Sequence, residues 1–309
     1  MNLVRLTRLY VIIFLCGLVT VFVSPRVLCA DEIEIETTDL ISGDISTETI
    51  PYYDEDSTFP FSPGYLGNVE NDYSPNRIIM SDDRTIVENT TRVPYRFIGK
   101  IYYTNNLGNT CEGGTGFLVG QNIVLTAAHC AYHKGNTIKS LTFIPGLNGS
   151  VKPYGEYTVT KVHVPKLYKN EIEIQTGNEY TPIMQKYDYA VLELDRNAGV
   201  TLGYFGLGGY GSSYNRNNLE GKNVTVAGYP KDKGGKLYRH KAAVESFNAE
   251  GYLIFYSVDT EDGQSGSPVI FPIQGRYYVV GIHTSAYSET LNRGRYITKN
   301  IVNLVNKYK

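Results

Sequence analysis

The stretch Asp262-Gly263-Gln264-Ser265-Gly266-Ser267-Pro268 places a serine in a turn rich in glycine. A serine hydroxyl becomes a useful nucleophile only when an adjacent base accepts its proton. Glycine at position 263 lets the backbone approach a substrate closely, so the N–H groups of Gly263 and Ser265 can both face a developing oxyanion. The stretch predicts Ser265 as the nucleophile of an acyl transfer and Gly263 and Ser265 as its oxyanion hole. The alternative is an ordinary serine in a polar loop.

A histidine suited to act as the base lies far upstream, in Thr126-Ala127-Ala128-His129-Cys130. It follows an apolar stretch, residues 123–126, that has the composition of a strand. The imidazole is therefore expected at the end of a buried strand, between small residues. We predict His129 as the general base, with a histidine that only fills the core as the alternative.

The third member of such a site is a carboxylate that orients the imidazole from a mostly apolar setting. Asp188 meets this condition, because residues 189–194 directly after it are strongly apolar. Glu171 and Glu173 lie in a polar stretch that is typical of a surface. Asp259 is too close to Ser265 in the chain to be the first choice. We predict Asp188, with a surface aspartate at a strand end as the alternative.

The order of these residues separates one class of hydrolase from others. His129, Asp188 and Ser265 follow one another in the order histidine, aspartate, serine, whereas an α/β-hydrolase has its serine first, in the motif Gly-x-Ser-x-Gly. A zinc site is not favoured, because Cys130 stands where the metalloprotease motif requires Glu. We therefore expect no metal and no cofactor in the reaction, and nothing in the sequence indicates binding to nucleic acid.

The region from residue 78 onward predicts an all-β fold. Many short runs of β-branched and aromatic residues are separated by Gly, Asn and Pro, which is typical of a sandwich or barrel. Only residues 297–307 have the periodicity of an amphipathic helix. The glycine-rich residues 203–211 suggest a division into two domains, 78–200 with His129 and Asp188, and 201–309 with Ser265 and the final helix.

The N-terminal part predicts export. Residues 1–30 combine a basic start, an apolar run and a small residue at the end, as in a secretory signal peptide; a membrane anchor is the alternative. Residues 31–77 carry twelve acidic residues and one basic residue, Arg77, whereas residues 78–309 carry 25 basic and 19 acidic residues. The acidic block is expected to be largely disordered and to act as a pro-segment; a tail without a role is the alternative.

Two cysteines remain once the predicted signal peptide is removed. An even pair in an exported protein indicates a disulfide, here between Cys111 and Cys130. It would close a loop of about twenty residues and stabilise the protein by about 3 kcal/mol.

With these motifs in place, the chain resembles the chymotrypsin-like serine proteases, and more closely the bacterial glutamyl endopeptidases of the staphylococcal and bacillus type. The resemblance covers about residues 77–309. It implies two six-stranded antiparallel β-barrels with the active site between them, a C-terminal helix, and secretion as a zymogen. Its carriers are Ser81–Thr85, Pro94–Arg96, Cys111, Thr126–Cys130, Tyr187–Leu194, Gly263–Pro268 and Gly281–Thr284.

The resemblance also implies a substrate preference and a route of activation. His283 would line the S1 pocket and receive a glutamate side chain, with Thr260 as a second polar group. Thr284 would face the aspartate of the triad, and Ser285 would contact the substrate through its backbone. The new N-terminus, formed by cleavage after Asn76 or Arg77, would approach S1. Two acidic residues, Glu261 and Asp262, depart from the pattern of the family and would repel a glutamate if they faced the pocket.

The sequence thus predicts a secreted, monomeric serine endopeptidase with protein or peptide substrates, a preference for Glu at P1, and its own pro-segment as a partner. After removal of the signal peptide no membrane association is expected. Two other functions stay open: a protease with a narrow target, similar to the exfoliative toxins, and a binding protein that has kept the protease fold but no longer cleaves.

Overall fold

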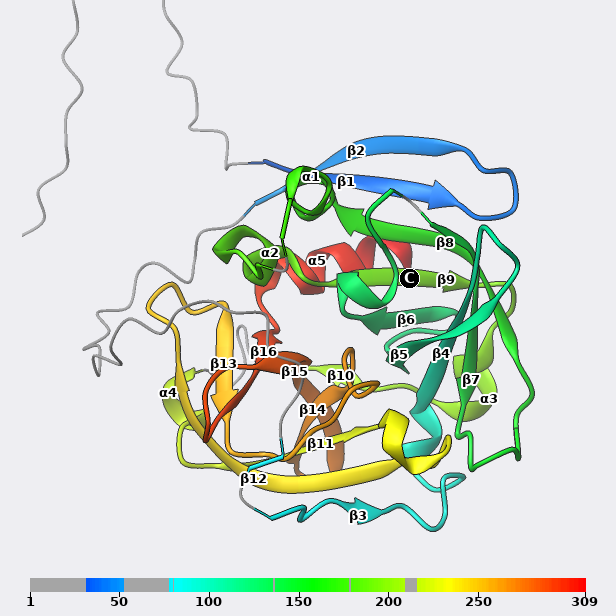
Figure 1. The fold of residues 1–309 in the computed structure, drawn as a ribbon. Coiled ribbons are helices and arrows are strands. Elements are labelled where there is room, and N and C mark those ends of the chain that lie inside the picture. Colours follow the sequence, from blue (N-terminus) through cyan, green and yellow to red (C-terminus); the bar gives the residue numbers. More distant parts are fainter. Residues whose placement is uncertain (1–31, 53–77, 80, 136, 178, 209–215) are drawn as a thin grey trace, which may run out of the picture.

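The computed structural model describes residues 32–52, 78–79, 81–135, 137–177, 179–208 and 216–309 (Figure 1). The predicted signal peptide, all of residues 53–77 and part of the glycine-rich seam therefore lie outside the described residues. Within the described residues, no helix combines the length and the apolar character needed to cross a membrane.

Two closed, six-stranded antiparallel barrels form the body of the protein, which confirms the predicted fold. The first has the hydrogen-bonded order β8-β7-β4-β5-β6-β9 and closes through β8 and β9. Its strands are β4 (Ile98–Asn105), β5 (Thr110–Leu118), β6 (Ile123–Thr126), β7 (Ile138–Pro145), β8 (Tyr157–Pro165) and β9 (Ala190–Leu194). Each has an apolar face that packs into a single core, as expected for a barrel too small to hold a channel.

The second barrel has the order β15-β14-β11-β12-β13-β16 and closes through β15 and β16. Its strands are β11 (Asn223–Gly228), β12 (Tyr238–Phe247), β13 (Leu253–Tyr256), β14 (Pro268–Ile273), β15 (Arg276–Ala286) and β16 (Asn292–Tyr296). Two short strands extend its sheet: β3 (Thr85–Ile86) pairs with β12, and β10 (Gly206–Leu207) runs parallel to β15. The chain thus touches the second barrel before it builds the first.

The C-terminal helix α5 (Lys299–Tyr308) is present as predicted, and it crosses from the second barrel to the first. Ile301, Leu304 and Val305 are fully buried in the core that β6 and β9 also line. Four helices were not predicted: α1 (Lys166–Ile174), α2 (Pro182–Tyr187), α3 (Ala198–Leu202) and α4 (Arg216–Leu219). The last three are too short to show a periodic pattern, and α1 lies in the polar stretch of Glu171 and Glu173, which was expected to be typical of a surface. Single 3₁₀ turns occupy residues 95–97, 128–130 and 231–233.

Residues 32–51 form a β-hairpin, so the prediction that residues 31–77 are largely disordered is wrong for this part. Strands β1 (Glu32–Asp39) and β2 (Ile45–Pro51) pair with one another, and β1 adds to the outer edge of β8. Ile33, Ile35 and Ile50 are buried. The prediction failed because composition alone counts acidic residues, whereas the alternation of isoleucine with polar residues gives the hairpin one apolar face.

The predicted disulfide is absent: the structure contains Cys111 and Cys130 as free thiols. Cys111 lies near the start of β5 and directs its sulfur toward the carbonyl of Asn109. Cys130 is buried and packs against Gly114 of the same strand, where a Cβ added to the glycine would stand 2.7 Å from the sulfur. The two sulfurs therefore have separate surroundings.

The two barrels are joined by a buried arginine of the second. Arg295 on β16 donates from Nε to the carbonyl of Lys186 in α2 at 2.7 Å, and from Nη1 to the carbonyls of Tyr252 and Tyr296 at 2.7 and 2.9 Å. Its exposed fraction is 3%. Since Lys186 lies two residues before Asp188, this contact also fixes the segment that carries the predicted aspartate.

Replacement of Arg295 by Met should lower the free energy of unfolding by about 2–4 kcal/mol, because buried carbonyl groups would lose their donor. The measurement is chemical denaturation followed by far-UV circular dichroism. The control is Arg276→Met at the exposed start of β15, which should change stability by no more than about 0.5 kcal/mol. Equal stability of the two variants would contradict the inter-barrel role.

Candidate active site

His129 and Asp188 meet because the strands next to them are paired. Strand β6 ends at Thr126, and β9 begins at Ala190; these two residues are opposite one another in the antiparallel register. The segment that leaves β6 therefore emerges beside the segment that enters β9. The 3₁₀ turn over residues 128–130 then directs His129 toward Asp188.

The contacts within this pair fix both side chains. His129 Nδ1 lies 2.8 Å from Asp188 Oδ2, and the backbone N–H of His129 donates to Asp188 Oδ1 at 3.1 Å. Tyr180 donates its hydroxyl to the same Oδ2. Asp188 is fully buried, whereas the His129 side chain is 20% exposed. His129 Nε2, on the far side of the ring, is buried and has no hydrogen-bond partner among the described residues.

Electrostatics favours the charged form of each partner. Burial lowers the pKa of His129, but the Asp188 carboxylate outweighs burial and raises the pKa above its ordinary value. Burial also raises the pKa of Asp188, but the His129 imidazole and the Tyr180 hydroxyl outweigh it and hold that pKa below its ordinary value. Asp188 therefore stays ionised at neutral pH.

Ser265 lies in a tight turn that is hydrogen-bonded to the first barrel. Thr115 on β5 donates its N–H to the carbonyl of Ser265 at 2.9 Å and its hydroxyl to the carbonyl of Gly263 at 2.9 Å. The Ser265 hydroxyl donates to the carbonyl of Thr284 at 3.3 Å. The turn requires glycine at 266, where φ is +81° and a Cβ would lie 2.1 Å from the carbonyl of Thr115.

The orientation of the neighbouring peptides bears on the predicted oxyanion hole. The carbonyl of Asp262 accepts the N–H of Lys231 at 2.7 Å, and the carbonyl of Gln264 accepts the N–H of Ser267 at 3.0 Å. In a trans peptide the N–H points away from its carbonyl. The N–H groups of Gly263 and Ser265 are therefore directed away from Lys231 and Ser267 respectively. Gly263 has φ of +89°, a conformation that favours glycine.

The predicted S1 residues are buried together on β15 and the loop before Ser265. His283 is fully buried, and its Nδ1 lies 2.6 Å from the hydroxyl of Tyr256. Burial, with a smaller contribution from the charge of His129, lowers the pKa of His283 to about 3, so this imidazole is neutral at neutral pH. The Thr260 hydroxyl is buried without a hydrogen-bond partner among the described residues.

One of the predicted contacts, that of Thr284 with the aspartate of the triad, differs from expectation. Thr284 donates its hydroxyl to the carbonyl of Arg293 at 3.4 Å, and Tyr180 provides the hydroxyl that Asp188 accepts. The Ser285 hydroxyl accepts from Nε of the buried Arg293 at 2.8 Å. The side chain of Ser285 is thus engaged with Arg293. No sequence pattern singled out Tyr180, since it is one of 27 tyrosines in the chain.

The two acidic residues before the turn, Glu261 and Asp262, have different partners. Asp262 is half-exposed and lies 3.5 Å from Lys231 Nζ. Glu261 accepts the backbone N–H of Asp262 at 2.9 Å through Oε1. Both carboxylates therefore have local partners, which reduces the repulsion that they would exert on an acidic substrate.

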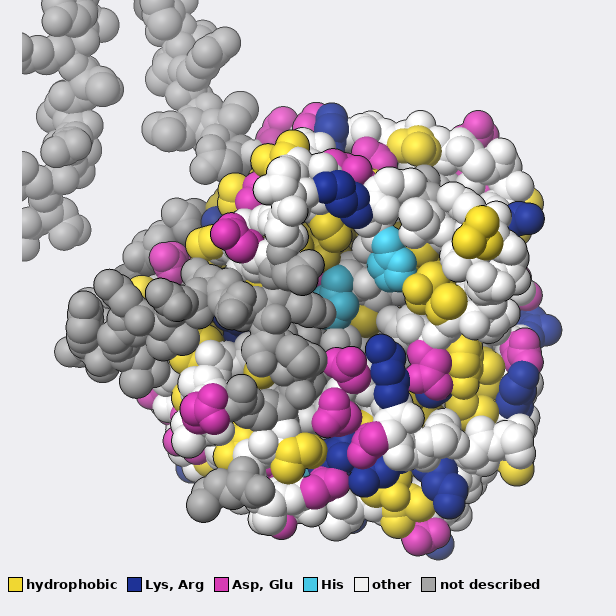
Figure 2. All heavy atoms as spheres, viewed as in Figure 1, with side chains coloured by type: hydrophobic (Ala, Val, Ile, Leu, Met, Phe, Trp, Pro, Cys, Tyr) yellow, Lys and Arg dark blue, Asp and Glu magenta, His cyan; other side chains and the backbone are white. Residues whose placement is uncertain are grey.

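A cavity of about 290 Å³ opens beside His129. It is largely apolar, and helix α1 forms one of its walls. Its lining residues are His129, Lys134, Tyr168, Ile172, Gln175, Gly177, Glu179, Tyr180 and Met184. Figure 2 shows histidine side chains near the middle of the same face of the molecule, with apolar side chains beside them. This is space in which a peptide side chain can bind next to the imidazole.

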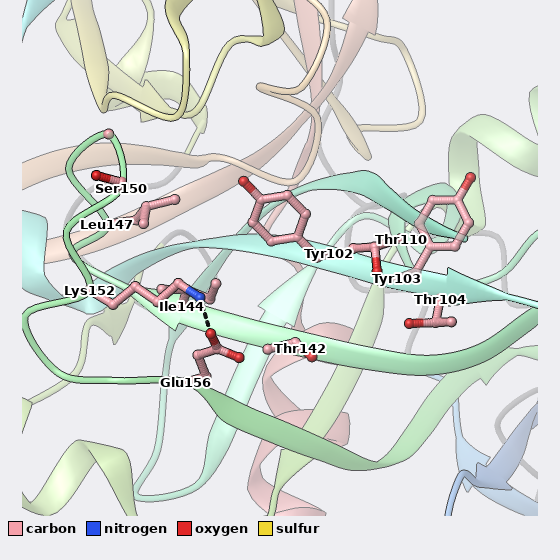
Figure 3. Close-up of a pocket in the computed structure, with 11 residues that line it drawn as sticks. Tyr102, Tyr103, Thr104, Thr110, Thr142, Ile144, Leu147, Ser150, Lys152 and Glu156 are labelled. Carbon is pink, nitrogen blue, oxygen red and sulfur yellow. Dashed lines mark hydrogen bonds and ion pairs between the residues drawn. The ribbon is translucent and has the colours of Figure 1, made fainter. Parts of the chain in front are cut away.

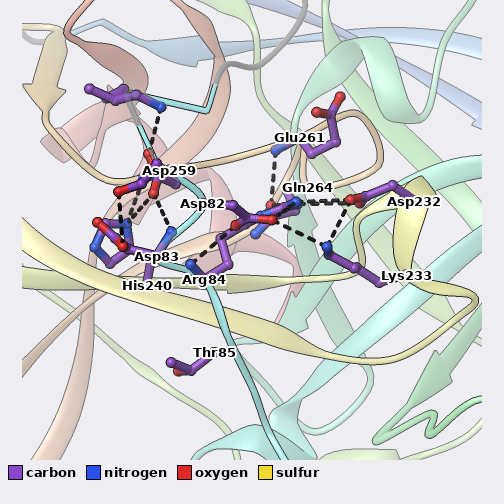
Figure 4. Close-up of polar contacts among 12 residues, drawn as sticks. Asp82, Asp83, Arg84, Thr85, Asp232, Lys233, His240, Asp259, Glu261 and Gln264 are labelled. Carbon is purple, nitrogen blue, oxygen red and sulfur yellow. Dashed lines mark hydrogen bonds and ion pairs between the residues drawn. The ribbon is translucent and has the colours of Figure 1, made fainter.

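A buried carboxylate ties the segment after residue 77 to the loop before Ser265 (Figure 4). Asp259 accepts the backbone N–H groups of Ile79 at 2.7 Å and Asp83 at 2.9 Å, and its own N–H donates to His240 Nδ1 at 2.8 Å. Among the described residues Asp83, His240 and Asp259 come close enough to share a cation. Their atoms nevertheless already hydrogen-bond within the chain.

The same segment supports the turn through an arginine. Arg84 is 7% exposed and pairs with Asp82 at 2.7 Å and with Asp232 at 2.9 Å. The Arg84 guanidinium, as a hydrogen-bond donor, lowers the pKa of Asp82 well below its usual range. The Arg84 side chain also reaches Gln264, whose Oε1 accepts the N–H of Glu261 at 2.9 Å. These contacts hold residues 261–264 in place next to Ser265.

A larger cavity of about 580 Å³ lies on the first barrel, over β4, β7 and the loop after β7 (Figure 3). Tyr102, Thr142, Ile144 and Leu147 line it, and Lys152 pairs with Glu156 at its edge. None of the predicted catalytic residues lines it. The smaller cavity, by contrast, is lined by one of them, His129.

A buried Asp–His pair on one barrel and a serine turn on the other define a serine protease of the trypsin type. Residues 86–306 match the family model described as Trypsin. The chain belongs to this family, and within it to the glutamyl endopeptidases, because it is 35% identical to the glutamyl endopeptidase of Bacillus licheniformis over 77% of this chain and 70% of that protein.

Three further proteins are similar to this chain. The chain is 32% identical to a Bacillus subtilis protein named extracellular metalloprotease, over 74% of this chain and 68% of that protein. A solved structure of a Glu endopeptidase in complex with MPD superposes with a TM-score of 0.60 and 30% identity, over 75% of this chain and 98% of that one. The protease Anisep from Arthrobacter nicotinovorans gives a TM-score of 0.55 at 17% identity, over 73% of this chain and 98% of that one, which shows the fold alone.

Removal of the Tyr180 hydroxyl by Tyr180→Phe should lower kcat/KM about tenfold or more, because a hydrogen bond to a charged group is worth about 1.5–3 kcal/mol. Asp188 would then act more strongly on His129 and raise its pKa further. Since His129 accepts a proton only in its neutral form, the acid limb of the pH profile should move to higher pH.

The control is Tyr189→Phe, whose hydroxyl is buried without a hydrogen-bond partner among the described residues. This variant should keep the activity and the pH profile of the parent protein. A Tyr180→Phe profile that stays in place, or moves to lower pH, would contradict the role given to Tyr180.

Proposed function

We propose that the protein cleaves peptide bonds through an acyl-enzyme on Ser265. The observation that carries this proposal is the buried pair of Asp188 and His129 with Nε2 directed away from Asp188. Rotation of the Ser265 hydroxyl from the carbonyl of Thr284 toward Nε2 would give the nucleophile its base. Asp188 keeps the imidazole in the tautomer with hydrogen on Nδ1 and stabilises the cation that forms.

The reaction follows from these positions. Ser265 Oγ attacks the substrate carbonyl as its proton passes to His129 Nε2, and the oxyanion accepts the N–H groups of Gly263 and Ser265. His129 then returns the proton to the leaving amine, and the C–N bond breaks. A water molecule, deprotonated by His129, attacks the acyl-enzyme; Ser265 leaves with that proton, and the second product carries the carboxylate.

We infer a preference for Glu at P1 from the state of His283. The imidazole is neutral and contacts the Tyr256 hydroxyl through Nδ1. If Tyr256 donates to Nδ1, the remaining hydrogen is on Nε2, and a substrate carboxylate would accept it in place of the Arg293 backbone group that the imidazole now contacts. The buried hydroxyl of Thr260 supplies a second donor. A neutral donor set of this kind avoids the cost of keeping an unpaired cation buried before the substrate binds.

A scan of P1 residues in a peptide series should give the highest kcat/KM for Glu, with Gln lower by about tenfold to a hundredfold, since a charge-assisted hydrogen bond is worth about 1.5–3 kcal/mol. His283→Gln should reduce this ratio. Ser265→Ala, which should also abolish labelling by a fluorophosphonate, is the background control. A preference for neutral or basic P1 would contradict the Glu assignment and implicate Asp262.

We also propose that the protein is secreted as a zymogen and is activated by cleavage near Arg77. The support is the docking of the following segment, because Ile79 and Asp83 already bond to Asp259, six residues before Ser265. A terminus formed at Ile78 would arise next to this loop. The acidic composition of residues 31–77 also complements the basic excess of residues 78–309.

Activation is tested by a full chain that carries the site of a sequence-specific protease ending at residue 77. Cutting should raise kcat/KM on a Glu peptide above the uncut value, because the loop before Ser265 gains the charge of the new terminus. The same chain without the inserted site, treated with the same protease, is the control. Equal activity before and after cutting would contradict the zymogen.

A further inference from the structure

The hairpin of residues 32–51 lies outside the matched family region, residues 86–306, yet it is built into the first barrel. Figure 1 shows β1 along the outer side of β8. The pairing is antiparallel and extends from Ile35 opposite Pro165 to Asp39 opposite Lys161. An added strand of this kind binds through main-chain hydrogen bonds and gains specificity from alternate side chains.

The alternate side chains on one face of the hairpin belong to the core. Ile33 and Ile35 of β1 are 1% and 0% exposed, and Ile50 of β2 is 4% exposed. Ile45 of β2 is, by contrast, 57% exposed. The hairpin is therefore held by a defined set of three isoleucines, and the surface below them would become exposed if it left.

The acidic side chains of the hairpin pair with cations of two helices. Glu34 lies 3.2 Å from Lys166 Nζ, and Glu36 pairs with Lys169; both lysines are on α1. On α5, Lys307 Nζ lies 2.6 Å from Glu48. These ion pairs fix the position of the acidic hairpin on a basic surface. This agrees with the opposite net charges of residues 31–77 and residues 78–309.

Two further polar contacts support the same docking. The Thr37 hydroxyl lies 2.8 Å from His163 Nδ1 on β8, and the Tyr308 hydroxyl donates to Glu48. The rings of His163 and Tyr308 are stacked with their centroids 3.6 Å apart. The hairpin thus contacts strand β8 and both helices, and each of these contacts is non-covalent.

Helix α1 connects the hairpin to the candidate active site. Lys169, which pairs with Glu36, is 5% exposed and lies 4.3 Å from the centroid of the Tyr132 ring, three residues after His129. Tyr168 and Ile172 of the same helix line the cavity beside His129. The ion pair that fixes Lys169 therefore also fixes α1, which forms one wall of that cavity.

We propose that residues 32–51 stay bound to the catalytic domain as a second chain once the connection in residues 53–77 is cut, and that they hold α1 in position beside His129. The contacts described above join residues 32–51 to residues of β8, α1 and α5, and none involves residues 53–77, so a cut in that connection breaks none of them. Retention of the hairpin shares with the proposed function only the cut, which the experiment supplies from outside. The position of α1 rests in addition on the proposed peptidase activity at His129 and Ser265.

The first test uses the full chain with Ser265→Ala and an inserted site for a sequence-specific protease in residues 53–77. After cutting, native size-exclusion chromatography and mass spectrometry should find the fragment with residues 32–51 and the fragment with residues 78–309 in equimolar amount in one peak. Urea should separate them. Elution of the short fragment alone under native conditions would overturn the proposal, whether or not the protein is a protease.

Two pairs of variants in this cut chain identify the contacts. Ile35→Asp should release the hairpin, and Ile45→Asp, the same change at an exposed position, should not. If Ile35→Asp prevents folding, Glu48→Gln is used in its place. Glu48→Gln should speed dissociation of the hairpin fragment on dilution, and Glu32→Gln, at the exposed start of β1, is its control. Salt should weaken retention by screening the ion pairs. Equal retention in both members of a pair would overturn the assigned contacts.

The positional part is tested with Ser265 intact. Release of the hairpin from the cut Ile35→Asp protein should raise KM for a peptide several-fold with a smaller change in kcat, because α1 lines the binding cavity but carries none of the proposed catalytic residues. The cut Ile45→Asp protein should keep both values. Unchanged KM after release would show that α1 is held without the hairpin and would overturn this part.

Discussion

The position of Ser265 depends on the hydrogen bonds of Thr115. This residue of β5 is fully buried and donates from its N–H to the carbonyl of Ser265 and from its hydroxyl to the carbonyl of Gly263. Its hydroxyl also accepts the N–H of Tyr229 from the second barrel at 3.0 Å. The Thr115 hydroxyl thus satisfies one buried donor, the N–H of Tyr229, and one buried acceptor, the carbonyl of Gly263, both on the second barrel. Each of these groups would otherwise lower the stability by about 1–3 kcal/mol.

The same residue links the serine turn to the histidine. The carbonyl of Thr115 accepts the hydroxyl of Thr126 at 2.7 Å, and Thr126 is the last residue of β6, three before His129. Gly266 packs against both threonines, at distances that exclude a Cβ. The two halves of the site are therefore spaced by buried backbone contacts, which deform far less than loops do.

Two histidines near this junction have opposite pKa shifts, and the reason is the neighbour of each. Both suffer from burial, which disfavours the cation. Asp188 more than compensates at His129, whereas Tyr256 offers His283 a neutral hydroxyl and His129 adds a like charge. His129 is thus protonated more readily than an ordinary histidine, whereas His283 is neutral at neutral pH.

The sequence was sufficient to predict the barrels, the C-terminal helix and the approach of His129 to Asp188, because strand composition, residue order and the family motifs report them directly. Contacts made by residues without a local signal could not be predicted. Tyr180 reaches Asp188 through the fold, and Thr115 looks like any threonine in a strand. The acidic hairpin shows the same limit: the charges that suggested disorder are balanced by lysines that lie more than a hundred residues away in the chain. An acidic segment remains unfolded because of its net charge only when no cations are placed to pair with it. Here the fold places three lysines next to the acidic hairpin.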